Sequence, residues 1–135
     1  MLQRKDKTGQ IMSTAGLVMT VIAAGMMGVS NLMLRAALDA MGGFGSSADG
    51  LLVDIFNLAT QPLLIIGLGI YGAAMLLWLR VLSEEPLGIS YPILVSLAFV
   101  IVSIGAVVVF KESVSPVKLL GVGVIVLGVI ILSNG

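Results

Sequence analysis

Four long apolar runs constrain this chain more than any other feature of its sequence. They cover about residues 11–37, 62–82, 87–110 and 117–132. A helix needs about 20 apolar residues to cross a hydrocarbon core roughly 30 Å thick, and each run is close to that length. Only 10% of the 135 residues are charged, against about 25% in soluble domains. The pattern predicts an all-α membrane protein, with a basic tail at residues 1–10 and a single domain of four transmembrane helices at residues 11–135.

A shorter segment, residues 51–60, lies between the first two runs and has a different pattern. It mixes leucine, isoleucine and phenylalanine with Asp54 and Asn57. Because it is too short to span a bilayer, we expect a short interfacial amphipathic helix between transmembrane helices one and two. The Gly/Ser-rich stretch before it, residues 41–50, predicts a loop.

Small residues indicate where helices approach one another closely. In the first run they recur at every fourth position, which places them on one stripe: Gly16, Thr20, Ala24 and Gly28. Such stripes are typical of helix contacts in membranes. Gly121 and Gly128, seven residues apart, predict a second close-packing surface on the last helix.

The composition argues against several classes of protein. The chain has no cysteine and no histidine, which excludes disulfides and thiolate metal sites and removes the commonest metal ligand and proton shuttle. We therefore predict that the protein is not an enzyme and holds neither metal nor cofactor. Its net charge is zero, so nothing favours binding to nucleic acid.

The basic residues predict the orientation in the membrane. Four lie on one side of the predicted bundle and three on the other: Arg4, Lys5, Lys7 and Arg80 against Arg35, Lys111 and Lys118. By the positive-inside rule we expect both termini in the cytoplasm. The near balance leaves open insertion in both orientations, with antiparallel pairing of two chains.

A set of residues after position 30 resembles a known family. The set comprises Pro62, Gly67, Tyr71, Trp78, Pro86-Leu-Gly-Ile-Ser-Tyr-Pro92, Phe110-Lys-Glu-Ser-Val-Ser-Pro116, Gly121 and Gly128. It resembles the EamA-like drug/metabolite transporter superfamily, which has a small multidrug resistance-like fold. Within it, the chain is most similar to the four-helix subunits of the aminoarabinose-phosphoundecaprenol flippase.

The resemblance implies a transport function. It implies a flippase that moves a polyisoprenyl-phosphate-linked sugar, or a similar amphiphile, across the cell inner membrane. The protein would act as a homodimer, or as a heterodimer with a similar subunit, in contact with membrane lipids. The small multidrug resistance branch uses an acidic residue in its first helix, and residues 11–34 contain none.

Two other functions stay open. One is a proton-coupled exporter of small metabolites or cations that would use Asp54, Glu84 or Glu85. The other is a non-transporting partner subunit of a membrane glycosyltransferase.

Arg35 and Asn31 are the first candidate substrate-binding residues. Arg35 follows a long apolar run, where a guanidinium suits a lipid phosphate by bidentate geometry; its alternative role is a flank that sets helix depth. Asn31, one turn earlier, is a candidate for binding a head group or a neighbouring helix.

The aromatic residues and Pro92 form a second group of candidates. We expect Tyr71 and Tyr91 to line a substrate pocket, and Trp78 to anchor its helix at the membrane surface. Pro92 lies inside the third predicted helix, where a missing N–H group permits a hinge.

Charged residues at the predicted turns complete the set. Arg80, Glu84 and Glu85 predict either a local ion pair or a gate. Lys111 and Glu112 predict a solvated helix end with a capping acid, or a contact to lipid head groups.

Overall fold

The computed structural model describes residues 12–45 and 48–134. In chain order the helices are α2 (Thr14–Met41), α3 (Leu51–Ala59), α4 (Pro62–Glu84), α5 (Leu87–Val108) and α6 (Pro116–Asn134). All except α3 are long and apolar enough to cross a membrane. The predicted fold class, four long apolar helices with a short helix between the first and second, is confirmed. The basic tail lies outside the described residues.

The first transmembrane helix ends later than the sequence predicted. It continues past residue 37 to Met41, and Gly42 follows it in the left-handed conformation, with φ of 83°. The polar residues Ser30, Asn31 and Arg35 do not interrupt it. The helix continues beyond the predicted end at residue 37 because the left-handed Gly42 sets its C-terminal cap.

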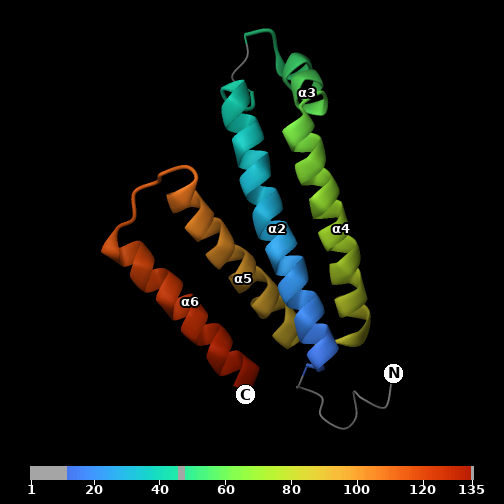
Figure 1. Cartoon of the computed structure of the whole chain (residues 1–135), viewed down its shortest axis with the longest axis vertical. Coiled ribbons are helices and arrows are strands. Elements are labelled where there is room, and N and C mark those ends of the chain that lie inside the picture. Colours follow the sequence, from blue (N-terminus) through green and yellow to red (C-terminus); the bar gives the residue numbers. More distant parts are fainter. Residues whose placement is uncertain (1–11, 46–47, 135) are drawn as a thin grey trace.

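Helix α2 is the centre of the bundle. It packs against α4 on one side and α5 on the other, and α6 contacts only α5 among the described elements. Figure 1 shows α6, α5, α2 and α4 in that order across the view, with α2 and α4 extending beyond the α5–α6 turn. The start of α2, the α4–α5 turn and the end of α6 lie at one end of the molecule.

The small-residue stripe of α2 packs as predicted. Gly16, Thr20, Ala24 and Gly28 are all buried. A methyl group built on Gly28 would stand 2.6 Å from Cγ2 and 2.8 Å from Cβ of Ile101 on α5. Only a glycine therefore lets the two helices approach this closely.

The predicted packing surface on the last helix does not form within this chain. No residue of α6 is buried, and a methyl group on Gly121 or Gly128 would meet nothing within 4 Å. The prediction was wrong for the protomer because α6 diverges from the bundle and touches α5 alone.

Trp78 occupies the core instead of a surface belt. It is 6% exposed and packs with Ala23, Ala24, Val81 and Leu94. The predicted role as a surface anchor is therefore wrong. Its position near the end of the apolar run did not reveal that the small residues of α2 leave room for an indole ring.

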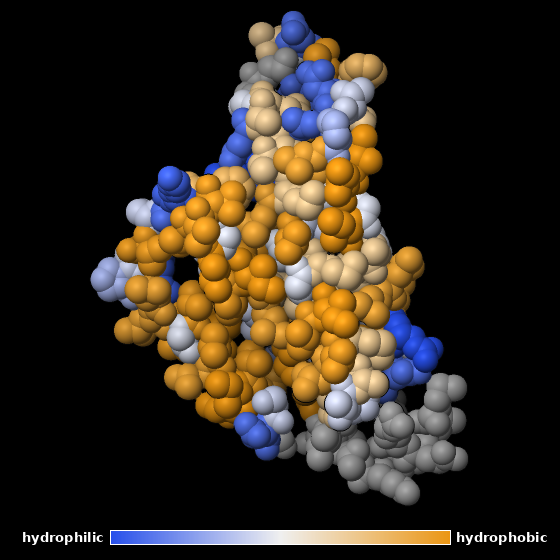
Figure 2. Space-filling view, in the orientation of Figure 1, coloured by the Kyte–Doolittle hydropathy of each residue, from blue (hydrophilic) through white to orange (hydrophobic). Residues whose placement is uncertain are grey.

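Polar residues gather toward the two ends of the bundle. Figure 2 shows hydrophobic residues over the middle of the visible face, and hydrophilic ones at its top, beside the α5–α6 turn and toward the lower edge. On α2, the polar residues Ser13 and Arg35 are about 33 Å apart at 1.5 Å per residue. That separation matches a hydrocarbon core of about 30 Å.

Candidate functional site

Arg35 lies at the centre of the more elaborate polar cluster. Its Nε atom is 3.0 Å from Oδ1 of Asp39, and its Nη1 atom is 3.7 Å from Oε1 of Glu112. The guanidinium carbon also stands 5.4 Å from the centre of the Phe110 ring, in cation–π geometry. We call Arg35, Asp39, Phe110 and Glu112 the arginine cluster.

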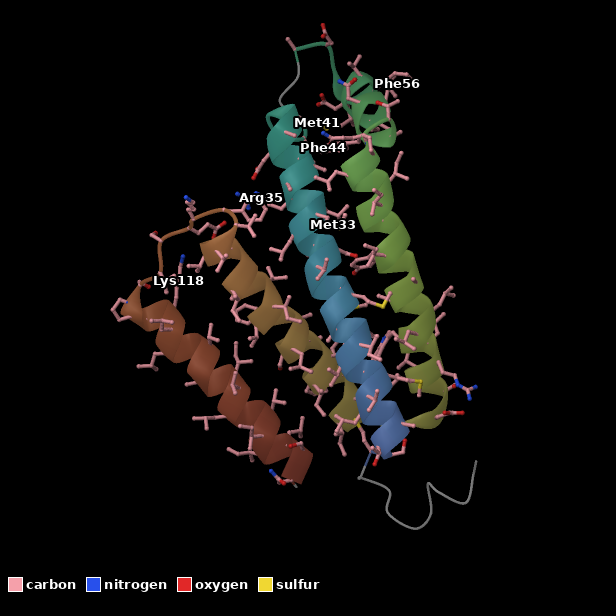
Figure 3. All side chains as sticks on the ribbon, in the orientation of Figure 1. Met33, Arg35, Met41, Phe44, Phe56 and Lys118 are labelled. Atoms are coloured by element: carbon pink, nitrogen blue, oxygen red, sulfur yellow. The ribbon has the colours of Figure 1, made fainter. Side chains whose placement is uncertain are left out.

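The turn after α5 brings Phe110 and Glu112 to α2. Helix α5 ends at Val108, and Lys111 takes the left-handed conformation with φ of 54°. The Glu112 amide donates a hydrogen bond to the Ala106 carbonyl at 3.1 Å, which folds the turn back on the end of α5. Figure 3 shows Arg35 projecting from α2 on the side of this turn.

The arginine cluster is open to its surroundings. The side chains of Arg35, Asp39 and Glu112 are 55%, 50% and 42% exposed. A guanidinium carries five N–H donors, and its planar fork matches a phosphate group. The cluster can therefore present hydrogen-bond donors to an oxyanion that approaches from outside the bundle.

Asn31 lies one turn before Arg35 but takes no part in the cluster. Its side-chain amide donates to the carbonyl of Met27 at 3.0 Å, within its own helix. The residue is exposed. In this structure it therefore contacts neither α4 nor α5 through a hydrogen bond.

At the opposite end of α2, Glu85 is tied to Ser13. The Ser13 amide donates to Oε2 of Glu85 at 3.0 Å, and the Ser13 hydroxyl donates to Oε1. The same hydroxyl accepts a bond from the Gly16 amide at 3.0 Å and so caps α2. Glu85 is only 9% exposed. We call Ser13 and Glu85 the latch, because they join the α4–α5 turn to the start of α2.

The latch corrects one grouping made from the sequence. Arg80 and Glu84 form the predicted local ion pair, with Nη2 and Oε1 2.9 Å apart. Glu85, grouped with them from the sequence, turns to Ser13 instead. The ion pair therefore excludes Glu85, because adjacent residues at a helix end point in different directions.

The two tyrosines lie at different depths from Arg35. Tyr91 is 53% exposed, and its ring centre is 6.1 Å from that of Trp78. Tyr91 is near the start of α5, whereas the arginine cluster lies past the end of that helix. Tyr71 is half-buried on α4, about 10 Å from Trp78 by helical rise. The structure therefore does not gather Arg35, Tyr71 and Tyr91 into a single site.

Pro92 follows Tyr91 inside α5. The helix continues beyond it to Val108. A role as a hinge stays a prediction.

Asp54 is held by the loop before α3. It is 2% exposed, and its Oδ2 atom accepts a hydrogen bond from the Gly45 amide at 2.9 Å. A buried carboxylate needs such donors. In this position Asp54 fastens the glycine-rich loop to α3.

Three residues of these clusters were missed from the sequence. Asp39 could have been found, since it stands four residues after Arg35 on one helix. Ser13 has the signal of an N-terminal cap, but its partner lies 72 residues away. Phe110 has no local signal, because its role depends on the register between α2 and α5.

Part of this chain is similar in sequence to known membrane proteins. A stretch of 63 residues is 51% identical to the probable 4-amino-4-deoxy-L-arabinose-phosphoundecaprenol flippase subunit ArnE of Salmonella typhimurium, Salmonella newport and Salmonella paratyphi B. Over this stretch the chain is similar to these flippase subunits. The stretch covers 47% of this chain and 56% of each relative, so it spans only about half of their length.

The homologues confirm the resemblance predicted from the sequence. They are named as probable flippase subunits. The chain itself has four helices long and apolar enough to span a membrane. No family model matches the chain, and no solved structure matches it.

Proposed function

We propose that this protein is a subunit of a flippase that moves a polyisoprenyl-phosphate-linked sugar, or a similar amphiphile, across the cell inner membrane. The observation that carries the proposal is Arg35, a half-exposed guanidinium at one end of the apolar span of α2. The homology to flippase subunits supports the same function.

The chemistry of such a lipid matches the surface of the chain. Its phosphate is an oxyanion that a guanidinium binds through two parallel N–H donors. Its hydrocarbon tail needs only an apolar face, and the outward faces of the helices provide one: Leu76, Leu120 and Ile131 are each about 70% exposed. The head group would therefore bind at Arg35 while the tail stays in the bilayer.

We further propose that the remaining candidates contact the lipid in turn as it moves between the two ends of the bundle. We place Lys111 beside Arg35 as a second contact for the head group, and Asn31 one turn deeper. Tyr71 and Tyr91 would follow at successively greater depth, with Pro92 as the hinge.

Pairing with a second copy or a similar subunit belongs to the proposal. Four helices alone rarely enclose a polar route, and here α6 contributes no buried residue. A neighbouring subunit would supply the missing wall.

No observation favours the proton-coupled exporter over the flippase. The three carboxylates that it would use each have a partner. Glu84 pairs with Arg80, Glu85 binds Ser13, and Asp54 accepts from Gly45.

Flipping in reconstituted vesicles tests the proposal. Purified protein in liposomes should move a fluorescent polyprenyl-phosphate sugar between leaflets, and Arg35→Ala should reduce the rate about tenfold or more. Arg80→Ala is the matched control, because Arg80 is also exposed and also pairs with a carboxylate four residues later. The control should keep the wild-type rate.

Two outcomes would speak against the proposal. Equal rates for wild type and Arg35→Ala would remove the role of Arg35. No flipping by the lone protein, together with its stable co-purification with a membrane glycosyltransferase, would favour the non-transporting partner instead.

A further inference from the structure

We propose that Glu112 competes with the lipid phosphate for Arg35. It occupies the guanidinium when no anionic head group is bound and leaves when one binds. The inference rests on the proposed function and adds an affinity-determining residue to the same site.

The two carboxylates on Arg35 are held in different ways. Asp39 lies on the same helix, four residues on, and its Oδ1 atom is 3.0 Å from Nε. Because both residues lie on α2, Asp39 stays beside Arg35 when other elements move. Glu112 comes from another element, and its 3.7 Å contact is an ion pair too long for a good hydrogen bond. Glu112 is therefore the partner that can be separated from Arg35.

Glu112 can move without disturbing buried packing. Residues 111–115 are all exposed. The backbone bond from Glu112 to Ala106 and the contact with Arg35 are its described ties to other residues. A shift of the turn would therefore cost little, whereas a shift of Asp39 would require a change in α2 itself.

The charges around Arg35 make this exchange necessary. One guanidinium already faces two carboxylates, so an incoming phosphate would place a third negative group around a single positive one. Negative groups that share one guanidinium repel one another. Departure of Glu112 removes one of them.

Binding measurements on the full chain in nanodiscs of neutral lipid test the inference. The probe is undecaprenyl phosphate, with undecaprenol, inorganic phosphate and phosphatidylglycerol in parallel. Glu112→Gln keeps the shape of the side chain and removes its charge. We expect it to lower the Kd for undecaprenyl phosphate roughly two- to fivefold, the range that loss of an exposed ion pair allows. Undecaprenol should show no gain.

Two further variants isolate the contact. Glu84→Gln removes the equivalent charge at the other end of the bundle, beside Arg80, and should leave the Kd unchanged. In an Arg35→Gln background, Glu112→Gln should give no gain, because the group for which it competes is absent. In the wild type, undecaprenyl phosphate should also speed amide hydrogen exchange in residues 111–115.

The outcomes separate this inference from the proposed function. If Arg35→Gln weakens binding but Glu112→Gln does not strengthen it, Glu112 is no competitor and the flippase proposal stands. If Arg35→Gln binds as tightly as wild type, the phosphate contact itself is wrong. A gain for inorganic phosphate or phosphatidylglycerol without one for undecaprenyl phosphate would overturn the inference that Glu112 competes with the phosphate of the polyprenyl lipid.

Discussion

Glu85 shows how one acidic residue is made stable at the edge of the bundle. A carboxylate that is 9% exposed costs free energy unless donors meet it. Ser13 supplies two, from its amide and its hydroxyl. The carboxylate also stands at the N-terminal end of α2, where the helix dipole favours negative charge. Glu85 therefore stabilises the fold locally instead of acting as a free acid.

Removing this carboxylate should destabilise the protein. Glu85→Ala leaves the half-buried Ser13 amide without its acceptor, and an unsatisfied donor costs up to about 1–3 kcal/mol when it is fully buried. Reversible unfolding in mixed micelles would measure the free energy of unfolding. Glu84→Ala is the control, since the exposed pair with Arg80 contributes at most about 1 kcal/mol. Equal losses of unfolding free energy for the two variants would show that the latch stabilises the fold no more than the exposed ion pair does.

At the scale of the element, the packing of α2 depends on where its glycines face. Gly28 faces Ile101, whose branched β-carbon cannot swing away from a new methyl group. Gly25 lies three residues earlier, and a methyl group there would meet nothing within 4 Å. Helix packing therefore requires a glycine at position 28 but not at position 25.

Alanine at these two positions should have opposite effects. Gly28→Ala should destabilise the α2–α5 contact by about 1–3 kcal/mol, the cost of overpacking. Gly25→Ala should be neutral or stabilising by up to about 1 kcal/mol, because alanine is the better helix former. Thermal unfolding in detergent measures both. A stable Gly28→Ala variant would show that α5 can shift away from α2.

At the scale of the whole molecule, the two polar ends predict opposite sides of a membrane. The chain contains no cysteine, so single cysteines can report topology without a background. Ser83→Cys marks the α4–α5 end and Ser113→Cys the α5–α6 turn; both residues are exposed. With both termini in the cytoplasm, an impermeant maleimide should label Ser113→Cys in intact cells. It should label Ser83→Cys only after permeabilisation.

The labelling also distinguishes the alternatives. About half labelling of each variant in intact cells would indicate insertion in both orientations. Full labelling of both would contradict a bundle that spans the membrane.

Much of the fold can be predicted from the sequence, because each helix corresponds to a local pattern of apolar or small residues. The apolar runs gave α4, α5 and α6 to within two residues at each end, and small-residue spacing gave the packing stripe of α2. What could not be predicted depends on contacts between distant segments. The burial of Trp78, the pairing of Glu85 with Ser13 and the approach of Glu112 to Arg35 all require the register of helices far apart in the chain. The isolation of α6 likewise depends on its angle to α5, for which the sequence has no signal.

The central place of α2 bears on biosynthesis. Among the described helices α2 is made first, and the next long helix, α4, packs directly on it. Helix α5 then meets the other side of α2, and α6 needs α5 alone. Every newly made helix thus finds its partner already in the membrane. The order of translation is therefore also an order in which these helix–helix contacts can form.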